Sequence, residues 1–386
     1  MPALPRPALP KPLPRHTILC VHSSDEMYGA DRVLLQVVAA VPDGRSADVQ
    51  VWLPAPEPGP VADPAPAKLS DELTRRGIAS RSRTLPVLRR RLMSASGILV
   101  LLRQVAAVVP ALVRLRPQVL YCSTSAVLLL APVARLLGVP RVVLHVQEIW
   151  SGPEAVLLRL LARFATDWVA ISEASAASLP AGLRARVTVI PNGVEDPVPS
   201  LKDHAAEGPV LFLMAGRWNS WKGHRTLLEA WDDGEPPGEL IILGGPPAAG
   251  AAADVRAMVA GLRYPETVRI VGEVPDITPY LDAADVMVVP SAAPEPFGLV
   301  AIEAFARRRP VIGSRGGGLA DVVTHGVTGW LFEPGDAAEL SGILRRVERP
   351  AVKAMGRLAR RTFEQQYTAE IFRENLWIWW KPVLEP

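Results

Sequence analysis

The sequence predicts an α/β protein made of two doubly wound domains, each a parallel sheet covered by helices. From Thr17 to about residue 367, short apolar runs alternate with longer amphipathic stretches, a pattern typical of parallel sheets. The alternation stops at a polar stretch rich in helix breakers, 196–208, and then starts again. A chain of 386 residues is also too long for one ordinary core. We therefore expect two domains that face each other across a cleft.

In the first half, 17–195, six apolar runs are expected to form strands. They are Thr17–His22, Val49–Leu53, Val119–Tyr121, Val142–Val146, Trp168–Ile171 and Val187–Ile190. Helices fit between them, for example over Gly29–Val41 and Glu154–Ala165. The Pro- and Ala-rich segment Pro54–Lys68 is expected to be a surface excursion, and the Pro-rich residues 1–16 a disordered tail.

The second half, 209–367, repeats the alternation of strands and helices. Its expected strands are Val210–Met214, Leu240–Leu243, Val268–Val271, Val286–Val289, Val311–Ile312 and Trp330–Phe332. A last helix is expected over Thr368–Trp380, and it carries three tryptophans. Clustered tryptophans most often anchor a docked helix, so residues 368–386 are expected to pack back toward the first domain.

Composition and charge argue against several classes of protein. A net charge of +3 gives no case for a nucleic-acid partner. The longest apolar run, Gly97–Val113, is interrupted by two polar residues and a proline, so we expect it to fall short of the roughly 20 residues of a membrane span. The only cysteines, Cys20 and Cys122, lie in apolar runs, as reduced buried thiols do. The Pro-rich start does not read as a signal peptide, so a cytoplasmic protein is expected.

The most informative local pattern is a pair of carboxylates, Glu295 and Glu303, eight residues apart around a glycine turn. A strand-like run ends at Pro290 and a helical run opens at Leu299, so one carboxylate lies in the loop and the other on the helix flank. The free N–H groups and positive dipole end of a helix start suit a phosphate. The pattern predicts a ligand in which a sugar is joined to a nucleotide.

Two further glycine turns follow the first expected strand of each half. Arg217 and Lys222 stand five residues apart on a loop flanked by glycines, and two such cations can clamp a diphosphate from two sides. An exposed charged loop is the alternative interpretation. In the first half, Gly29 follows Tyr28 at a strand-to-helix turn, where a glycine allows close backbone approach to a bound group.

In their order along the chain, these patterns resemble retaining glycosyltransferases of family 4, which have the GT-B fold of two Rossmann-like domains. The resemblance covers nearly the whole chain from Thr17 to about Tyr367. The motifs that carry it are Tyr28-Gly29-Ala30-Asp31, Ala170-Ile171-Ser172-Glu173, Val189 to Val194, Gly216-Arg217 with Lys222-Gly223, Gly272-Glu273-Val274, and the E-x7-E pair Glu295 and Glu303.

The resemblance implies a role for each motif. Arg217 and Lys222 would bind the donor diphosphate and stabilise the charge that builds on it as the glycosidic bond breaks. Glu295 would hold the hydroxyls of the donor sugar, Glu303 those of the ribose, and Val274 would lie against the base. The other donor contacts implied are Gly29 and the backbone of Phe297, Gly298 and Leu299.

The implied reaction is retaining transfer of a hexosyl unit from a UDP- or GDP-linked hexose to a hydroxyl of a glycan, glycolipid or small-molecule acceptor, in cell-envelope polysaccharide or glycoconjugate biosynthesis. No separate cofactor is implied. The Asp-x-Asp metal site of the rival transferase fold does not occur in the sequence, so metal independence is expected. The residues assigned to catalysis are Arg217, Lys222, Glu295 and His145.

One departure from the family pattern concerns the end of the strand expected at Val142–Val146. Many relatives carry a histidine after this strand, but the common spacing puts Gln147 there and His145 two residues earlier, on the same strand face. Either side chain could line the reacting sugar, and a histidine merely satisfied inside the sheet is the alternative. Tyr28, Gln147 and Glu148 are expected to contact the acceptor.

Other functions stay open from the sequence. A nucleotide-sugar epimerase or hydrolase of the same fold is compatible with His145 and Glu148. A non-catalytic sugar-nucleotide-binding subunit is compatible with Gln147 at the usual histidine position. A dinucleotide-dependent oxidoreductase is disfavoured, because no Gly-x-Gly-x-x-Gly follows either first strand.

The stretch 85–116 mixes basic and apolar residues and includes three consecutive arginines, Arg89 to Arg91. Basic amphipathic segments bind anionic membrane surfaces. A solvated helix with one buried face is the alternative. This stretch therefore predicts a cytoplasmic protein that could contact the cytoplasmic face of a membrane.

Overall fold

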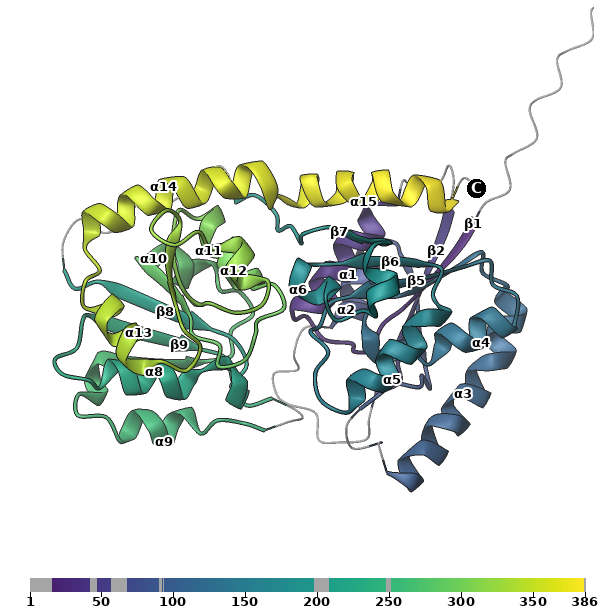
Figure 1. Ribbon diagram of the computed structural model, residues 1–386, viewed down its shortest axis with the longest axis horizontal. Coiled ribbons are helices and arrows are strands. Elements are labelled where there is room, and N and C mark those ends of the chain that lie inside the picture. The colour runs from purple at the N-terminus through teal and green to yellow at the C-terminus, as the bar shows by residue number, and fades with distance from the viewer. Residues whose placement is uncertain are drawn as a thin grey trace, which may run out of the picture.

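The computed structural model describes residues 16–41, 47–56, 68–89, 92, 94–197, 208–247 and 251–384. They form two domains side by side, each with one parallel sheet flanked by helices (Figure 1). The fold class expected from the sequence is confirmed. Most of the expected N-terminal tail, of the Pro54–Lys68 excursion and of the 196–208 linker lies outside the described residues.

The sheet of the first domain has seven parallel strands in the order β3-β2-β1-β4-β5-β6-β7. The strands are β1 (His16–Val21), β2 (Ala47–Pro54), β3 (Ala79–Arg83), β4 (Val119–Cys122), β5 (Arg141–Val146), β6 (Asp167–Ala170) and β7 (Val187–Val189). Strand β3 was missed by the sequence analysis, because its residues Ala-Ser-Arg-Ser-Arg form no apolar run. It pairs with β2 alone, at the edge, where a polar strand can remain exposed.

Two layers of helices cover the faces of this sheet and build separate cores. One face carries α3 (Ala95–Leu115), α4 (Leu130–Leu136), α5 (Glu154–Leu161) and the short 3-10 helices η2 (Ser125–Val127) and η3 (Ala162–Phe164). The other face carries α1 (Gly29–Ala39), α2 (Leu69–Arg75) and the C-terminal helix α15 (Ala369–Leu384). Two short helices, α6 (Glu173–Ala176) and α7 (Ala181–Arg184), connect β6 to β7.

The sheet of the second domain has six parallel strands in the order β10-β9-β8-β11-β12-β13. The strands are β8 (Leu211–Ala215), β9 (Glu239–Leu243), β10 (Val268–Gly272), β11 (Val286–Val289), β12 (Val311–Ser314) and β13 (Gly329–Phe332). The helices are η4 (Ser220–Lys222), α8 (His224–Trp231), α9 (Val255–Ala260), η5 (Pro265–Thr267), α10 (Thr278–Ala283), α11 (Leu299–Ala306), α12 (Leu319–Val322), α13 (Ala337–Leu344) and α14 (Arg349–Gln366).

The end of the chain ties the two domains together. Helix α14 lies along the second domain, and α15 continues across the junction onto the first (Figure 1). At the crossing, the N–H of Val194 donates to Tyr367 O and the N–H of Ala369 donates to Val194 O. A Cβ on the neighbouring Gly193 would lie 2.3 Å from Thr368 O, so only glycine fits there. The fully buried Trp380 of α15 then packs on Tyr121, with ring centroids 5.4 Å apart.

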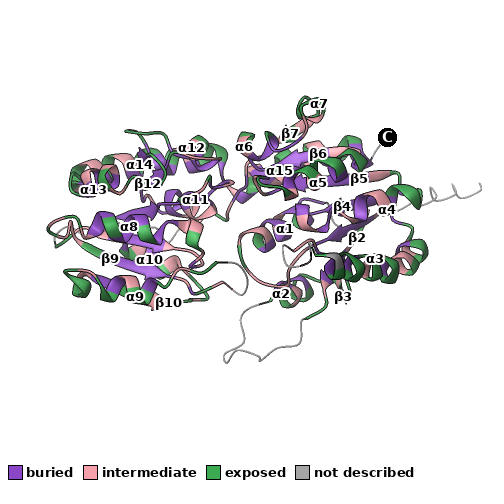
Figure 2. Ribbon diagram, turned by 60° about the horizontal axis from the view of Figure 1, so that its bottom comes forward, coloured by how far each residue is buried: buried purple, intermediate pink, exposed green. Residues whose placement is uncertain are grey.

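Much of the surface of helix α3 is exposed (Figure 2). The most apolar 18-residue stretch within Ser96–Leu115 has a mean hydropathy of 2.0, yet only 17% of that stretch is buried. By length and composition this helix could cross a membrane, which corrects the expectation that the run is too short. Val108 and Leu112 nevertheless pack into the core of the first domain, so α3 lies against the sheet along one face and exposes the rest.

Candidate functional site

Polar side chains from both domains meet at the junction, where the carboxyl ends of the central strands carry their loops. The loop after β1 reaches the loops after β8 and β10, and helix α1 reaches α11. In parallel sheets of this kind, ligands bind at these strand ends. The junction is therefore the candidate site.

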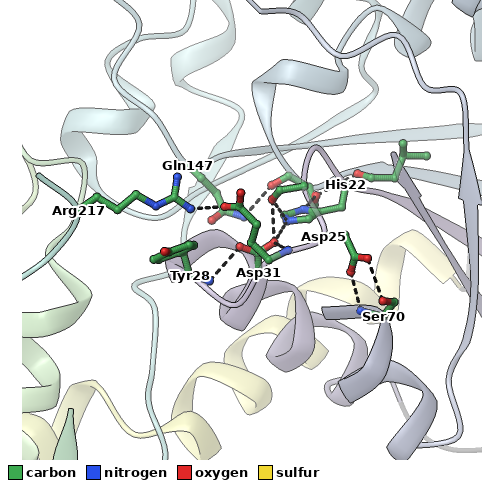
Figure 3. Close-up of polar contacts among 11 residues, drawn as sticks. His22, Asp25, Tyr28, Asp31, Ser70, Gln147 and Arg217 are labelled. Carbon is green, nitrogen blue, oxygen red and sulfur yellow. Dashed lines mark hydrogen bonds and ion pairs between the residues drawn. The ribbon is translucent and has the colours of Figure 1, made fainter. Parts of the chain in front are cut away.

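Arg217 follows β8 and is held by two side chains of the first domain (Figure 3). Its guanidinium forms an ion pair with Glu26 and stacks over the ring of Tyr28, 3.5 Å from the ring centroid. The hydroxyl of Tyr28 in turn donates to Glu273 Oε1 at 3.0 Å. These contacts bind the β1 loop to the second domain through charge and stacking.

Lys222 and Glu295 are joined directly. The Nζ atom of Lys222 lies 3.0 and 2.9 Å from the two carboxylate oxygens of Glu295, and Ser291 Oγ donates to the same carboxylate at 2.7 Å. The lysine ends η4, and the next residue, Gly223, has φ +78°. A Cβ at Gly223 would lie 1.7 Å from Pro290 O, so the lysine loop can press against the end of β11 only with glycine here.

Glu303 lies on the flank of α11, which begins after Gly298 at φ +92°. Its carboxylate accepts a hydrogen bond of 2.9 Å from Arg32 Nη1 of helix α1. Burial raises the pKa of the Glu303 carboxyl, and the charge of Arg32 opposes that shift. Glu295 and Glu303 are thus each paired with a cation, one within the second domain and one across the junction.

A buried network fixes the loop that carries Glu26 and Tyr28 (Figure 3). Asp31 accepts hydrogen bonds from His22 Nε2 at 3.0 Å, Ser24 Oγ at 2.7 Å and the N–H of Tyr28 at 3.1 Å. His22 Nδ1 lies 2.5 Å from Ser123 Oγ at the end of β4. Burial pushes the pKa of Asp31 upward, but these hydrogen bonds outweigh burial and lower it. The loop is therefore anchored from inside the sheet.

His145 and Gln147 have different surroundings. His145 is fully buried, and its Nδ1 lies 2.7 Å from the hydroxyl of Tyr121. Burial lowers the pKa of His145 to about 3, so its ring is neutral at pH 7. Gln147 Nε2 donates to Ser123 O at 2.7 Å, beside the His22 network. Gln147 follows the last residue of β5 and lies at the carboxyl end of the sheet, whereas His145 lies within the strand. The catalytic role assigned to His145 stays a prediction.

The remaining sequence-predicted residues fall into two groups. Gly29 faces the loop at the start of α11, since a Cβ there would lie 3.0 Å from Leu299 Cδ1. Phe297 and Val274 pack into the core below the same loops. Glu148 is instead bonded to Ser125 inside the first domain.

Four polar residues contact the predicted ones or the recognised motifs, and no role was expected for them from the sequence. They are Glu26, Arg32, Glu273 and His22. The first three face partners 191, 271 and 245 residues away in the chain, so no local spacing could have revealed them. Two signals existed: Glu273 itself and Asp31, the partner of His22, stand inside recognised motifs. Across the described ranges, no group of three or more His, Cys, Asp or Glu side chains is arranged to hold a metal ion.

Two family models match the two halves of the chain. Residues 27–196 match Glycosyltransferase Family 4, and residues 200–362 match Glycosyl transferases group 1. The chain is 33% identical over 167 residues to a D-inositol 3-phosphate glycosyltransferase of Pseudarthrobacter chlorophenolicus, covering 41% of this chain and 40% of that one. It is 30% identical over 168 residues to a lipopolysaccharide 1,2-N-acetylglucosaminetransferase of Salmonella typhimurium, covering 39% and 44%. These alignments span under half the length of the curated relatives.

Solved structures match over nearly the whole chain at low sequence identity. An Anabaena protein, Alr3699/HepE, in complex with UDP-glucose has a TM-score of 0.74 and 22% identity, covering 93% of this chain and 98% of that one. Sucrose-phosphate synthase from Thermosynechococcus elongatus has a TM-score of 0.75 and 19% identity, covering 96% and 100%. At such identities, these matches establish the shared two-domain fold.

Proposed function

The chain carries a glycosyltransferase family 4 domain followed by a group 1 glycosyl transferase domain in the GT-B arrangement, and we propose that it is a retaining, metal-independent glycosyltransferase. It moves a hexosyl unit from a nucleotide-sugar to an acceptor hydroxyl. One observation carries the proposal: two cations and two carboxylates, Arg217, Lys222, Glu295 and Glu303, gather at the junction on glycine-bounded loops and a helix start.

The pairing of the two cations explains how they bind a diphosphate. Arg217 pairs with Glu26 and Lys222 with Glu295, so both cations already hold carboxylate oxygens. A diphosphate offers the same kind of anionic oxygen to both. When the donor binds, its diphosphate replaces Glu26 as the partner of Arg217 and shares Lys222 with Glu295. Glu295 then also binds the sugar hydroxyls, and Glu303 binds the ribose.

The same cations serve the chemical step. As the glycosidic bond breaks, negative charge grows on the leaving diphosphate, and fixed positive charge stabilises it. The acceptor hydroxyl attacks the sugar on the face from which the diphosphate leaves, and the departing phosphate oxygen takes the proton of that hydroxyl. Glu295 binds the sugar in this scheme and does not act as a nucleophile.

A UDP- or GDP-linked hexose is the donor class we propose. The Anabaena structures hold UDP and UDP-glucose in the same fold, which supports a nucleotide-sugar. The names of the curated relatives, with inositol phosphate and lipopolysaccharide acceptors, support a role in envelope polysaccharide or glycoconjugate synthesis.

A donor screen tests the proposal. The melting temperature is measured with UDP, GDP and ADP and with their glucose, galactose, mannose and N-acetylglucosamine conjugates. A nucleotide at about 100 times its dissociation constant should stabilise the fold by about 2.7 kcal/mol. The proposal fails if no nucleotide or conjugate raises the melting temperature. With the donor known, the anomeric signal of the product by NMR tests retention, and activity after EDTA treatment tests metal independence.

We also propose that the protein is cytoplasmic and contacts the inner face of a membrane through residues 85–116. Ile98, Leu99 and Leu102 of α3 are 52%, 49% and 61% exposed, and such an apolar surface favours an interface. Arg89 precedes the helix, while Arg90 and Arg91 lie outside the described residues. Vesicles with anionic phospholipid should sediment the protein, and Arg89/Arg90/Arg91→Ala should sediment less. Equal sedimentation of both proteins contradicts the basic contact.

A further inference from the structure

A cavity lies in the first domain, and neither Arg217 nor Lys222 lines it. It has a volume of about 250 Å³ and is lined by Leu88 and Arg89, by η2, by the β5–α5 connection and by α5. Its walls are mostly apolar. They are formed by Leu88, Ala126, Ile149, Trp150, Leu157 and Leu158. None of the residues with a role in the proposed transfer lines this cavity.

One carboxylate, that of Glu148, is fixed in this apolar lining. Ser125 Oγ donates to Glu148 Oε2 at 2.6 Å, and the N–H of Ser125 reaches the same oxygen at 3.3 Å. Trp150 Nε1 donates to Ser125 Oγ at 2.6 Å, so the indole wall and the carboxylate are joined through one hydroxyl. Neither bond from Ser125 uses Oε1. This polar chain presents an oriented acceptor of hydrogen bonds to a ligand in the cavity.

The cavity adjoins the sheet edge that forms the candidate site. Glu148 follows Gln147, whose side chain bonds to Ser123 O, and Ser123 in turn bonds to His22. The other walls come from the layer of α3, α4 and α5, the layer that also carries the exposed apolar side chains of α3. The cavity therefore has a polar end toward the transfer site and apolar walls from the helix layer that we place at the membrane.

We propose that this cavity is the acceptor subsite and that the acceptor is an amphiphile, with an uncharged, hydroxyl-bearing head and an apolar chain. The inference rests on the proposed transferase function and names its acceptor class. Glu148 accepts a hydrogen bond from a head hydroxyl, and the leucine and tryptophan walls hold the start of the chain. Burying an apolar chain against these walls removes its surface from water, and this burial supplies the affinity.

The charges around the cavity favour a neutral head over an anionic one. Among the described residues that line it, Glu148 and Glu154 carry negative charge and Arg89 carries positive charge. Burial raises the pKa of the Glu148 carboxyl, while its hydrogen bonds with Ser125 and with the backbone of Gln147 and the charge of His22 oppose that shift. A second anion placed beside Glu148 would be repelled at low dielectric.

The test is binding of n-octyl β-D-glucoside to the full chain by calorimetry, below its micelle concentration. Methyl β-D-glucoside has the same head without the chain, and octanoate has a similar chain with an anionic head. Leu157→Ser changes a wall, while Val156→Ser is the matched control, since Val156 is 69% exposed on the same helix and does not line the cavity. Glu148→Gln removes the carboxylate. The UDP and GDP thermal shift is measured on every variant.

We expect octyl glucoside to bind at least about tenfold more tightly than either control ligand, since chain burial supplies most of the affinity. Leu157→Ser should weaken octyl glucoside binding at least about fivefold, and Val156→Ser should change it by less than about twofold. Glu148→Gln should reduce the difference in affinity between octyl glucoside and octanoate, because the repulsion of the anionic head is removed. Equal effects of the two serine variants, or no preference for octyl glucoside, overturn the inference. If nucleotides still stabilise the protein then, the transferase proposal survives. If octyl glucoside binds as expected but no nucleotide does, the transferase proposal falls and the acceptor assignment with it.

Discussion

The two domains share a parallel-sheet architecture but use their carboxyl edges differently. The second domain presents partly exposed cations, Arg217 and Lys222. The first domain carries a buried polar network behind its site loop, with His22 and Asp31 at 0% and 2% exposure. Most of the exposed large apolar side chains also belong to the first domain. Of fifteen such residues in the described chain, ten lie between Ile98 and Phe164.

This difference indicates two kinds of recognition. A diphosphate is small, charged and chemically constant, so a few fixed charges on glycine turns are enough to bind it. The first domain instead holds its site loop with buried hydrogen bonds. It also presents apolar surface and a cavity in the layer of α3, α4 and α5. If this comparison is right, substitutions in the second domain should impair donor chemistry, and substitutions in the first should change stability or loop position.

The largest effect is expected for Lys222→Ala. Loss of one fixed charge at the leaving diphosphate should lower kcat by about 10² to 10³, as loss of one oxyanion donor does in other enzymes. Steady-state kinetics with the donor found in the screen measures it. Lys353→Ala, at an exposed lysine of α14, is the control. A loss below about tenfold would contradict the diphosphate role of Lys222.

Asp31→Asn should act on stability. A buried carboxylate that accepts several hydrogen bonds is replaced by a neutral amide, which should cost about 1–3 kcal/mol of unfolding free energy at pH 7. Because the folded pKa of Asp31 is lowered below its ordinary 3.8, its carboxylate stabilises the fold above that pH. That contribution is lost as the pH falls through the lowered folded pKa.

Urea unfolding of Asp31→Asn and the unmodified chain at pH 7, 5 and 3 checks this sign. The difference in unfolding free energy should shrink at the lowest pH. Asp71→Asn, at an exposed position of α2, should show no such trend. A difference that grows on acidification would mean that Asp31 does not anchor the loop as an ionised group.

Glu303→Gln should mainly weaken nucleotide binding. The ribose would lose a charged hydrogen-bond acceptor, which is worth about tenfold in dissociation constant, while kcat changes less. Calorimetry with the free nucleoside diphosphate measures it. A large fall in kcat with unchanged affinity would place Glu303 in the chemical step instead.

The smallest effect is expected for Glu26→Gln, which probes the contact between the two domains. Without its carboxylate, Arg217 is free to meet the diphosphate, so donor affinity should rise by no more than about fivefold, the range of an exposed ion pair. The rise should fade at high salt. Weaker donor binding would show that Glu26 positions Arg217 for the donor and does not compete with it.

Much of the second domain's site was predictable from sequence. Arg217, Lys222 and Glu295 lie on short connections and Glu303 on the helix α11 that follows, and the backbone around Gly223 and Gly298 has the positive φ that favours glycine. Such requirements leave a local signature. Strand β3 left none, because an edge strand of alternating polar residues reads as a loop, and the extent of α3 was underestimated because a proline and two polar residues interrupt an otherwise apolar helix.

By itself, the sequence determined the fold class, the two parallel-sheet domains and the charged residues of the candidate site, because periodicity and glycine turns act over a few residues. Only the tertiary structure decided that Arg217 meets Glu26, that Arg32 meets Glu303, that His145 is buried, and that α3 exposes its apolar surface. The reason is physical: burial and ion pairing depend on segments up to 271 residues apart in the chain, and no local pattern records which of them come into contact.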